Sequence, residues 1–197
     1  GVKVVNSVKS PFTIAEGFNQ SKPYVFKKDE ELYDDFTAEI YDELHDTNDK
    51  TNWELAQIVR LTSPDTNNSV FLDVGSGTGQ CVNMLKNTGY RVYGVDKSPN
   101  MIEYAENKYP NIDLINANIN DSMTFERASF THILCTKMTI YQFRNKKQFF
   151  NNCYQWMIPN GYLILHLVDR KRFNLIEPKH NKEIKWTPLV PPKKKRC

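Results

Sequence analysis

The stretch Phe71–Gly79, FLDVGSGTG, predicts the centre of the fold, because an apolar run with one acidic residue leads directly into three glycines. The apolar residues suit a strand buried on both faces of a parallel sheet. The glycines, which permit positive φ and close approach of a ligand, are Gly75, Gly77 and Gly79. A helix is predicted from about Gln80, so that its first N–H groups and the positive end of its dipole face the turn. We therefore expect an anionic or carboxylate-bearing ligand there.

The spacing of these glycines disfavours two common nucleotide motifs. The dinucleotide motif G-x-G-x-x-G places its third glycine where Gln80 stands. The phosphate-loop motif requires a Gly-Lys pair that does not follow Gly75 or Gly77. A nicotinamide-linked oxidoreductase therefore remains only as an alternative, and binding of a nucleoside triphosphate is disfavoured.

A second predicted strand, residues 90–95, ends in Asp96. This aspartate follows the glycine turn by about 20 residues, where nucleotide-binding folds place a carboxylate that binds the ribose. Ser98 and Pro99 then predict a helix start, with serine as the N-cap and proline in the first turn. The turn and the carboxylate together favour a nucleoside cofactor.

Two segments, DVGSGTG at residues 73–79 and VDKSPNMIEYA at residues 95–105, resemble the glycine turn and the D-x-S-x-x-M-x-x-A segment of the class I S-adenosylmethionine-dependent methyltransferases. The resemblance covers about residues 31–169 and implies S-adenosylmethionine as the cofactor. The cofactor-binding residues that it implies are Asp73, Gly75, Ser76, Gly77, Gly79, Asp96, Lys97, Met101, Asn118, Ile119 and Thr136. The family usually has an acidic residue at the position of Asn118, but the asparagine carbonyl can still accept a hydrogen bond from the adenine amino group.

Alternating strands and helices predict an α/β fold with a doubly wound, mostly parallel sheet and right-handed crossovers. Further strands are expected at residues 112–115, 130–136 and 162–168, with a turn at residues 158–161 in which Asn160 tolerates left-handed φ. A helix is expected over residues 144–156. Its predicted inward face comprises Phe149, Phe150, Cys153, Tyr154 and Trp156.

Two further helices are predicted before the sheet, within residues 29–63. The first has an apolar stripe at every fourth residue, formed by Leu32, Phe36, Ile40 and Leu44. The second runs from about Thr51 and ends before Ser63-Pro64. In the resembling family such helices cover the cofactor, so Tyr33 and Tyr41, together with Met138, are candidates for a lid or substrate contact. Core packing is the alternative for both tyrosines.

The resemblance implies methyl transfer, which requires chiefly that donor and acceptor be held at near-attack distance. If the acceptor must lose a proton, Tyr141 and His166 are the ionisable residues nearest the expected strand ends, and a pocket-wall role is the alternative for His166. The segment TKMTIY, residues 136–141, lacks the motifs of nucleic-acid methyltransferases. We therefore predict transfer to an N or O atom of a small-molecule or protein acceptor. A catalytically inactive adaptor with the same fold is the other alternative.

The 197 residues predict one globular domain with flanking segments. We expect an irregular arm at residues 1–28, a methyltransferase domain at residues 29–169, and a basic, proline-containing segment at residues 170–197. The domain comprises lid helices at residues 29–63 and a cofactor-binding core at residues 69–169. The last segment shows no convincing strand pair, whereas the family's sheet ends with one. We expect either a fragment or missing strands supplied by a partner or an unseen segment.

Four scattered cysteines, without a C-x-x-C pair, predict neither a zinc site nor a disulfide framework. No apolar run approaches the roughly 20 residues that span a bilayer, and the N-terminus is too polar for a secretion signal. These features favour a cytoplasmic protein without membrane or nucleic-acid partners. The terminal PPKKKRC, residues 191–197, could instead serve nuclear import.

Overall fold

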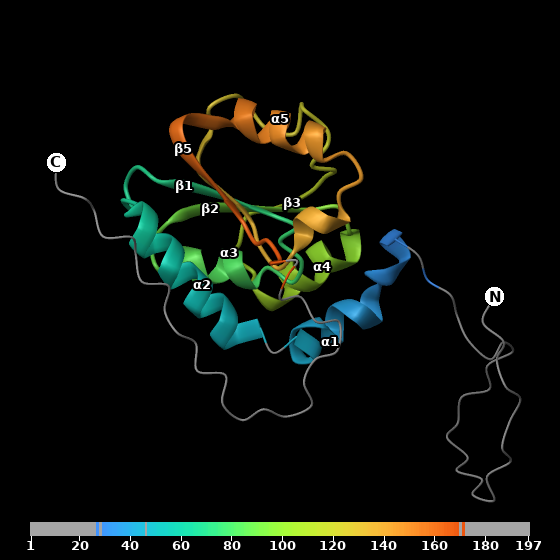
Figure 1. The fold of residues 1–197 in the computed structure, drawn as a ribbon. Helices are drawn as coiled ribbons and strands as arrows, with labels where there is room; N and C mark the ends of the chain where they lie inside the picture. Colours follow the sequence, from blue (N-terminus) through green and yellow to red (C-terminus); the bar gives the residue numbers. More distant parts are fainter. Residues whose placement is uncertain (1–26, 28, 46, 170, 172–197) are drawn as a thin grey trace, which may run out of the picture.

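The computed structural model describes residues 27, 29–45, 47–169 and 171. Its centre is a five-stranded sheet with the strand order β3-β2-β1-β4-β5, in which all neighbouring strands are parallel (Figure 1). The strands are β1 (Val70–Val74), β2 (Arg91–Asp96), β3 (Leu114–Asn116), β4 (Phe130–Cys135) and β5 (Met157–Leu165). The predicted parallel α/β fold is confirmed. The strand order reverses between β1 and β4, which is where open α/β sheets bind ligands.

Helices lie on both faces of this sheet. They are α1 (Asp35–His45), α2 (Thr47–Thr62), α3 (Gln80–Asn87), α4 (Pro99–Lys108) and α5 (Lys146–Trp156), with short 3-10 helices η1 (Asp29–Leu32) and η2 (Thr139–Gln142). Figure 1 shows α1 to α4 on one side of the sheet and α5 on the other. The predicted helix start at Ser98 is confirmed, because the Ser98 hydroxyl accepts a hydrogen bond from the Met101 N–H at 3.2 Å.

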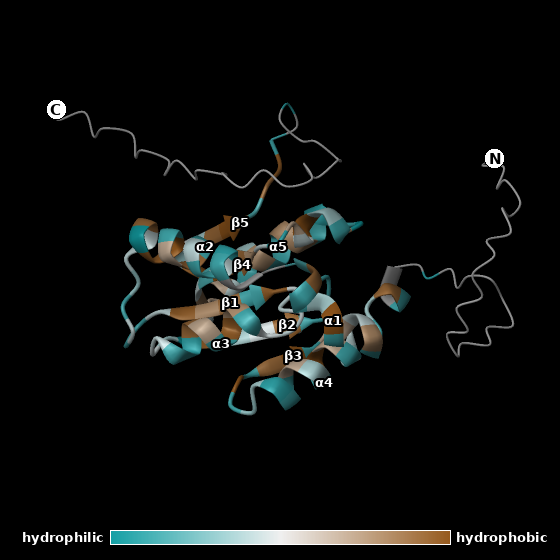
Figure 2. Cartoon of the chain, turned by 90° about the horizontal axis from the view of Figure 1, so that it is seen from below, coloured by the Kyte–Doolittle hydropathy of each residue, from teal (hydrophilic) through white to brown (hydrophobic). Residues whose placement is uncertain are grey.

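Each face of the sheet has its own apolar core, and Figure 2 shows the hydrophobic colour of the strands. Side chains alternate along β1, so that Phe71 faces α2 and α3 while Leu72 and Val74 face α5. On the α5 side the largest fully buried residues are Phe149 and Trp156. Two-sided burial explains why β1 is a continuous apolar run apart from Asp73.

No helix covers the connection from β3 to β4, which runs through residues 117–129. This loop is attached to α5 by two side chains. The buried Asn152 donates its Nδ2–H to the Ile119 carbonyl at 2.9 Å, and the Trp156 indole donates to the Ser122 carbonyl at 3.3 Å. Phe125 packs edge-to-face against Phe130 and Trp156, each with a ring-centroid distance of 5.1 Å. The loop is therefore a packed layer of the fold.

The predicted inward faces of two helices were wrong in part. Leu32, Phe36 and Leu44 are 48, 64 and 67% exposed, and α1 instead buries Ala38. The reason is that α1 packs against α4 and the glycine turn through polar side chains, so its apolar stripe does not face the core. In α5, Phe149, Cys153 and Trp156 are buried at positions i, i+4 and i+7, whereas Phe150 and Tyr154 fall outside this face and are 42 and 81% exposed.

The predicted turn at residues 158–161 lies inside β5 as an irregularity. Phe130 pairs with Met157 and His132 pairs with Tyr162, so two steps along β4 correspond to five along β5. Asn160 has a φ of 63°, as predicted for a residue that tolerates the left-handed region. The predictions for residues 1–26 and 172–197, including the missing strand pair, lie outside the described residues. No helix in the described part combines the length and the hydrophobicity needed to cross a membrane.

Replacing Asn152 with alanine should lower the free energy of unfolding by about 1–3 kcal/mol, because the Ile119 carbonyl loses its buried donor. Urea denaturation followed by circular dichroism measures this. Gln148→Ala is the matched control: it removes the Gln148 hydrogen bond to Asn152 Oδ1 and leaves the bond to the loop. Equal losses in the two variants would contradict the proposed attachment.

Candidate functional site

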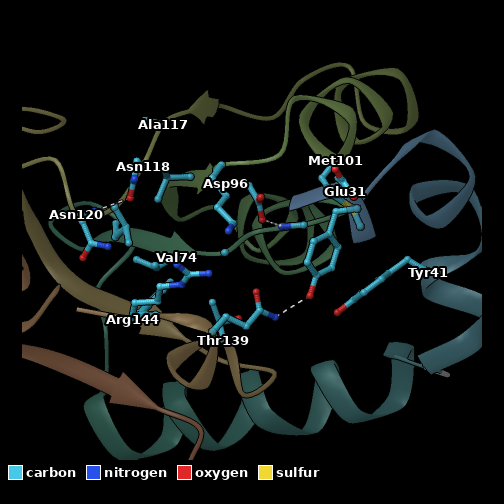
Figure 3. Close-up of a pocket in the computed structure, with 18 residues that line it drawn as sticks. Glu31, Tyr41, Val74, Asp96, Met101, Ala117, Asn118, Asn120, Thr139 and Arg144 are labelled. Carbon is cyan, nitrogen blue, oxygen red and sulfur yellow. Dashed lines mark hydrogen bonds between the residues drawn. The ribbon is translucent and has the colours of Figure 1, made fainter. Parts of the chain in front are cut away.

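A cleft of about 550 Å³ lies over the carboxyl ends of β1 and β2 (Figure 3). This volume falls within the range of small-molecule and cofactor sites. The residues that line it come from η1 and α1, the glycine turn, the segments after β2 and β3, and the segment after β4: Glu31, Tyr33, Tyr41, Val74, Gly75, Gly77, Val95, Asp96, Lys97, Met101, Ala117, Asn118, Ile119, Asn120, Thr139, Gln142, Phe143 and Arg144. The cleft therefore lies at the predicted crevice beyond the strand ends.

The glycine turn forms the floor of the cleft, and two of its glycines are required for different reasons. Gly75 has a φ of +71°, and a Cβ there would lie 2.4 Å from Thr139 Cγ2, so only glycine fits. Gly77 has a φ of +51°, and a Cβ there would meet nothing within 4 Å. Because Gly77 lines the cleft, that open space is available to a ligand. The predicted roles of these glycines in permitting positive φ and close approach are consistent with this geometry.

Asp96, at the end of β2, is tied to both sides of the cleft. Its Oδ2 accepts a hydrogen bond from the Gly77 N–H at 2.9 Å, and its Oδ1 accepts one from the Ser98 N–H at 2.9 Å. Burial raises the pKa of Asp96, and these two backbone N–H groups act in the opposite direction. A carboxylate has about four acceptor positions, more than these backbone N–H groups use, so it can also accept from a ligand. Such a group can accept hydrogen bonds from a pair of neighbouring hydroxyls.

Asp73 does not line the cleft. It lies beneath the glycine turn with only 3% of its surface exposed, hydrogen-bonded to the Cys81 thiol. Burial raises its pKa to about 6, while the ammonium group of Lys137 lowers it. The Asp73 carboxylate thus contacts α3, directly after the glycine turn. Its predicted contact with the amino-acid end of the cofactor stays a prediction.

Asn118 and Ile119, predicted to contact adenine, both line the cleft on the side of β3. The Asn118 Oδ1 already accepts a hydrogen bond from the Asn120 N–H at 3.0 Å. An amide oxygen has two lone pairs, so one acceptor position remains. Asn118 can therefore still accept from an exocyclic amine.

The lid candidates Tyr33 and Tyr41 also line the cleft. The Tyr33 hydroxyl accepts a hydrogen bond from Gln142 Nε2 at 2.8 Å, which joins η1 and α1 to the segment after β4. Burial raises the pKa of Tyr33, and it raises the pKa of Tyr41 to about 12. Both phenols are therefore neutral hydrogen-bonding groups near neutral pH.

The two predicted catalytic residues lie away from the cleft lining. Tyr141 is 49% exposed, and its hydroxyl accepts a hydrogen bond from the Val168 N–H at 3.0 Å. His166 follows β5, and its Nδ1 lies 3.4 Å from Glu54 Oε1. Neither predicted catalytic role gains geometric support. Ser76, Gly79, Thr136 and Met138 were also predicted and also lie outside the lining, whereas Lys97 and Met101 belong to it.

The sequence prediction missed three residues after β4 that do reach the cleft, namely Gln142, Phe143 and Arg144. The chain reverses there because Lys137 and Met138 have φ values of 47° and 62°. This left-handed pair precedes η2, which places Thr139 and Gln142 at the cleft. Neither lysine nor methionine signals left-handed backbone, so the sequence held no cue for this turn. In Figure 3 the Arg144 side chain points into the cleft.

Comparison with known proteins finds a family match for the central part of the chain. Residues 72–165 match the family model described as "Methyltransferase domain". This match covers the sheet and the glycine turn, and it supports the resemblance to the class I S-adenosylmethionine-dependent methyltransferases. S-adenosylmethionine is the cofactor of this family, and the predicted resemblance is confirmed.

The individual relatives are similar to this chain at low sequence identity or over only part of its length. The chain is 25% identical to the phosphoethanolamine N-methyltransferase of Plasmodium falciparum over 78% of this chain and 59% of that protein. It is 32% identical to the demethylmenaquinone methyltransferase of Chlorobaculum tepidum over 50% of this chain and 41% of that protein. The match thus spans about half the length of these relatives. A solved methyltransferase fold from Methanococcus maripaludis aligns with a TM-score of 0.58 at 17% identity, over 72% of this chain and 65% of that one.

The raised pKa of Asp73 predicts a pH dependence of stability. Between about pH 4 and pH 6 the folded methyltransferase binds more protons at Asp73 than the unfolded chain does, so this residue lowers the free energy of unfolding as the pH rises. Asp73→Asn lacks this dependence. Its stability relative to the wild type should therefore improve by up to about 3 kcal/mol from pH 4 to pH 7.

Urea denaturation at several pH values measures this difference. Asp113→Asn, which removes an exposed carboxylate that pairs with Lys86 at 2.7 Å, controls for a general loss of negative charge. A stability difference between Asp73→Asn and the wild type that stays constant across this pH range would show that Asp73 is not destabilised by burial.

Proposed function

We propose that this methyltransferase transfers the methyl group of S-adenosylmethionine to an N or O atom of a small-molecule acceptor. The observation that carries the proposal is the Asp96 carboxylate, which borders the cleft and has more acceptor positions than its bonds to Gly77 and Ser98 use. The two curated relatives, by their names, also act on small molecules, phosphoethanolamine and demethylmenaquinone.

The residues around the cleft fit the proposed cofactor. Asp96 would accept hydrogen bonds from the two ribose hydroxyls, and Asn118 with Ile119 would hold the adenine. The open space above Gly77 would allow the rest of the cofactor to approach the backbone. When bound, the cofactor supplies an activated methyl group on a sulfonium, so the protein has mainly to position the acceptor and exclude water.

Tyr33 and Gln142 are the residues proposed to position the acceptor. They form a hydrogen-bonded bridge at the cleft, and both line it. Because the Tyr33 oxygen accepts from Gln142, its own O–H is directed elsewhere and can donate to an acceptor atom. The raised pKa keeps this phenol protonated near neutral pH, so it orients the acceptor through a hydrogen bond.

Asp96→Asn should weaken binding of S-adenosylhomocysteine at least about tenfold, because a charged acceptor is replaced by a neutral amide that also brings an N–H group towards the Gly77 and Ser98 amides. Isothermal titration calorimetry measures the dissociation constant. Asp113→Asn, remote from the cleft, is the matched control. An unchanged dissociation constant for Asp96→Asn would contradict the assignment of the ribose site.

Tyr33→Phe should lower kcat about tenfold or more and change S-adenosylhomocysteine affinity little, because it removes one hydroxyl proposed to face the acceptor. The assay is formation of S-adenosylhomocysteine with a panel of small amines and alcohols that includes phosphoethanolamine. Tyr141→Phe is the matched control, since its hydroxyl bonds to Val168 away from the cleft. Loss of turnover in Tyr141→Phe alone would assign the role to Tyr141 instead.

A further inference from the structure

The inward face of α1 is attached to the rest of the domain by one carboxylate, Asp42, whose side chain is 16% exposed. Its Oδ1 accepts a hydrogen bond from the Thr78 hydroxyl at 2.7 Å. Its Oδ2 forms an ion pair with Lys108 Nζ at 2.8 Å. Asp42 therefore joins α1 to the glycine turn and to the end of α4.

Thr78 is the member of the glycine turn that makes this contact. It stands between Gly77 and Gly79 and is 1% exposed, so its hydroxyl is shielded from water. A charge-assisted hydrogen bond in such surroundings is stronger than one between neutral groups. The Lys108 pair is partly exposed, and exposed pairs contribute little. The Thr78 bond is thus the stronger of the two attachments.

Two tyrosines that precede this attachment in the sequence line the cleft. Tyr41 precedes Asp42 directly and lines the cleft. Tyr33, just before α1, is held through its backbone carbonyl, which accepts from the Ser98 hydroxyl at 2.9 Å. Ser98 in turn donates its N–H to Asp96. Residues 31–45, the lid segment, are therefore bonded at two points to the turns that flank the cofactor cleft.

Little apolar packing supports the lid segment. Leu32, Phe36 and Leu44 are exposed, and Ala38 is its only fully buried residue among those described. Its placement consequently depends on polar contacts. The bond from the Thr78 hydroxyl to Asp42 is a side-chain contact between α1 and the glycine turn.

We propose that Asp42 is a positioning residue that couples cofactor binding at the glycine turn to closure of the lid segment over the acceptor side of the cleft. This inference rests on the proposed function, because the ligand at the turn is taken to be the cofactor. Coupling of this kind is reciprocal. A ligand that orders the glycine turn stabilises the lid segment, and detachment of the lid segment lowers the affinity for the ligand.

The test uses five single variants of the full chain. Asp42→Leu and Thr78→Val each remove the bond. Asp42→Asn keeps a side-chain oxygen that accepts the bond, and Thr78→Ser keeps the hydroxyl that donates it. These two variants are the conservative controls. Lys108→Met removes the ion pair alone. Calorimetry gives the affinity for S-adenosylhomocysteine, and hydrogen exchange of residues 35–45, with and without this ligand, reports on the lid segment.

We expect Asp42→Leu and Thr78→Val each to lower the affinity for S-adenosylhomocysteine about fivefold or more. Each should also abolish the protection of residues 35–45 from hydrogen exchange that this ligand confers on the wild type. The double variant Asp42→Leu/Thr78→Val should bind S-adenosylhomocysteine no more weakly than either single variant, because both changes remove the same bond. Asp42→Asn, Thr78→Ser and Lys108→Met should remain within about twofold of the wild type.

Wild-type affinity and ligand-induced protection in both Asp42→Leu and Thr78→Val would overturn the inference and leave the proposed function intact. Additive losses in the double variant would also overturn it, because independent structural damage would then explain them. A wild-type chain that fails to bind S-adenosylhomocysteine would overturn the proposed function itself, and the coupling with it.

Discussion

The bonds from the Asp96 carboxylate to the Gly77 and Ser98 amides are the constraint on which the site depends. One oxygen fixes the middle of the glycine turn after β1, and the other fixes the start of α4 after β2. Two neighbouring strand ends are thereby held in a single geometry. Because the carboxylate is buried and keeps acceptor positions towards the cleft, the same group that builds the site can also recognise a ligand.

The other walls of the cleft are held in place by contacts of different strength. Asn152 holds the loop between β3 and β4 through the Ile119 carbonyl, so the wall that this loop forms is attached to the core. The opposite wall consists of the lid segment and η2, joined by the bond between Tyr33 and Gln142. Few buried apolar contacts support that wall, which is typical of elements that move when ligands bind. The cleft therefore combines a wall that is held by the core with a wall that is held mainly by polar contacts.

Much of the cofactor side could be predicted from sequence, because its determinants are local. The alternate glycines, Asp96 at the end of a strand and the Ser98 cap each act within a few residues, and the sheet confirms their positions. The acceptor side could not be predicted in the same way. Because Lys137 and Met138 have left-handed backbone, Gln142 lines the cleft and Tyr141 does not. Neither lysine nor methionine indicates such a turn in the sequence. The inward face of α1 was also mispredicted, since its polar contact with Thr78 outweighs its apolar period.

The most direct test of the central claim is a two-dimensional amide NMR titration of the wild-type chain with S-adenosylhomocysteine. Binding in the cleft predicts the largest shifts at the amides of Gly75, Gly77, Asp96 and Asn118, with no comparable change in α5. No shift at millimolar ligand, or shifts confined to residues outside the cleft, would contradict the account.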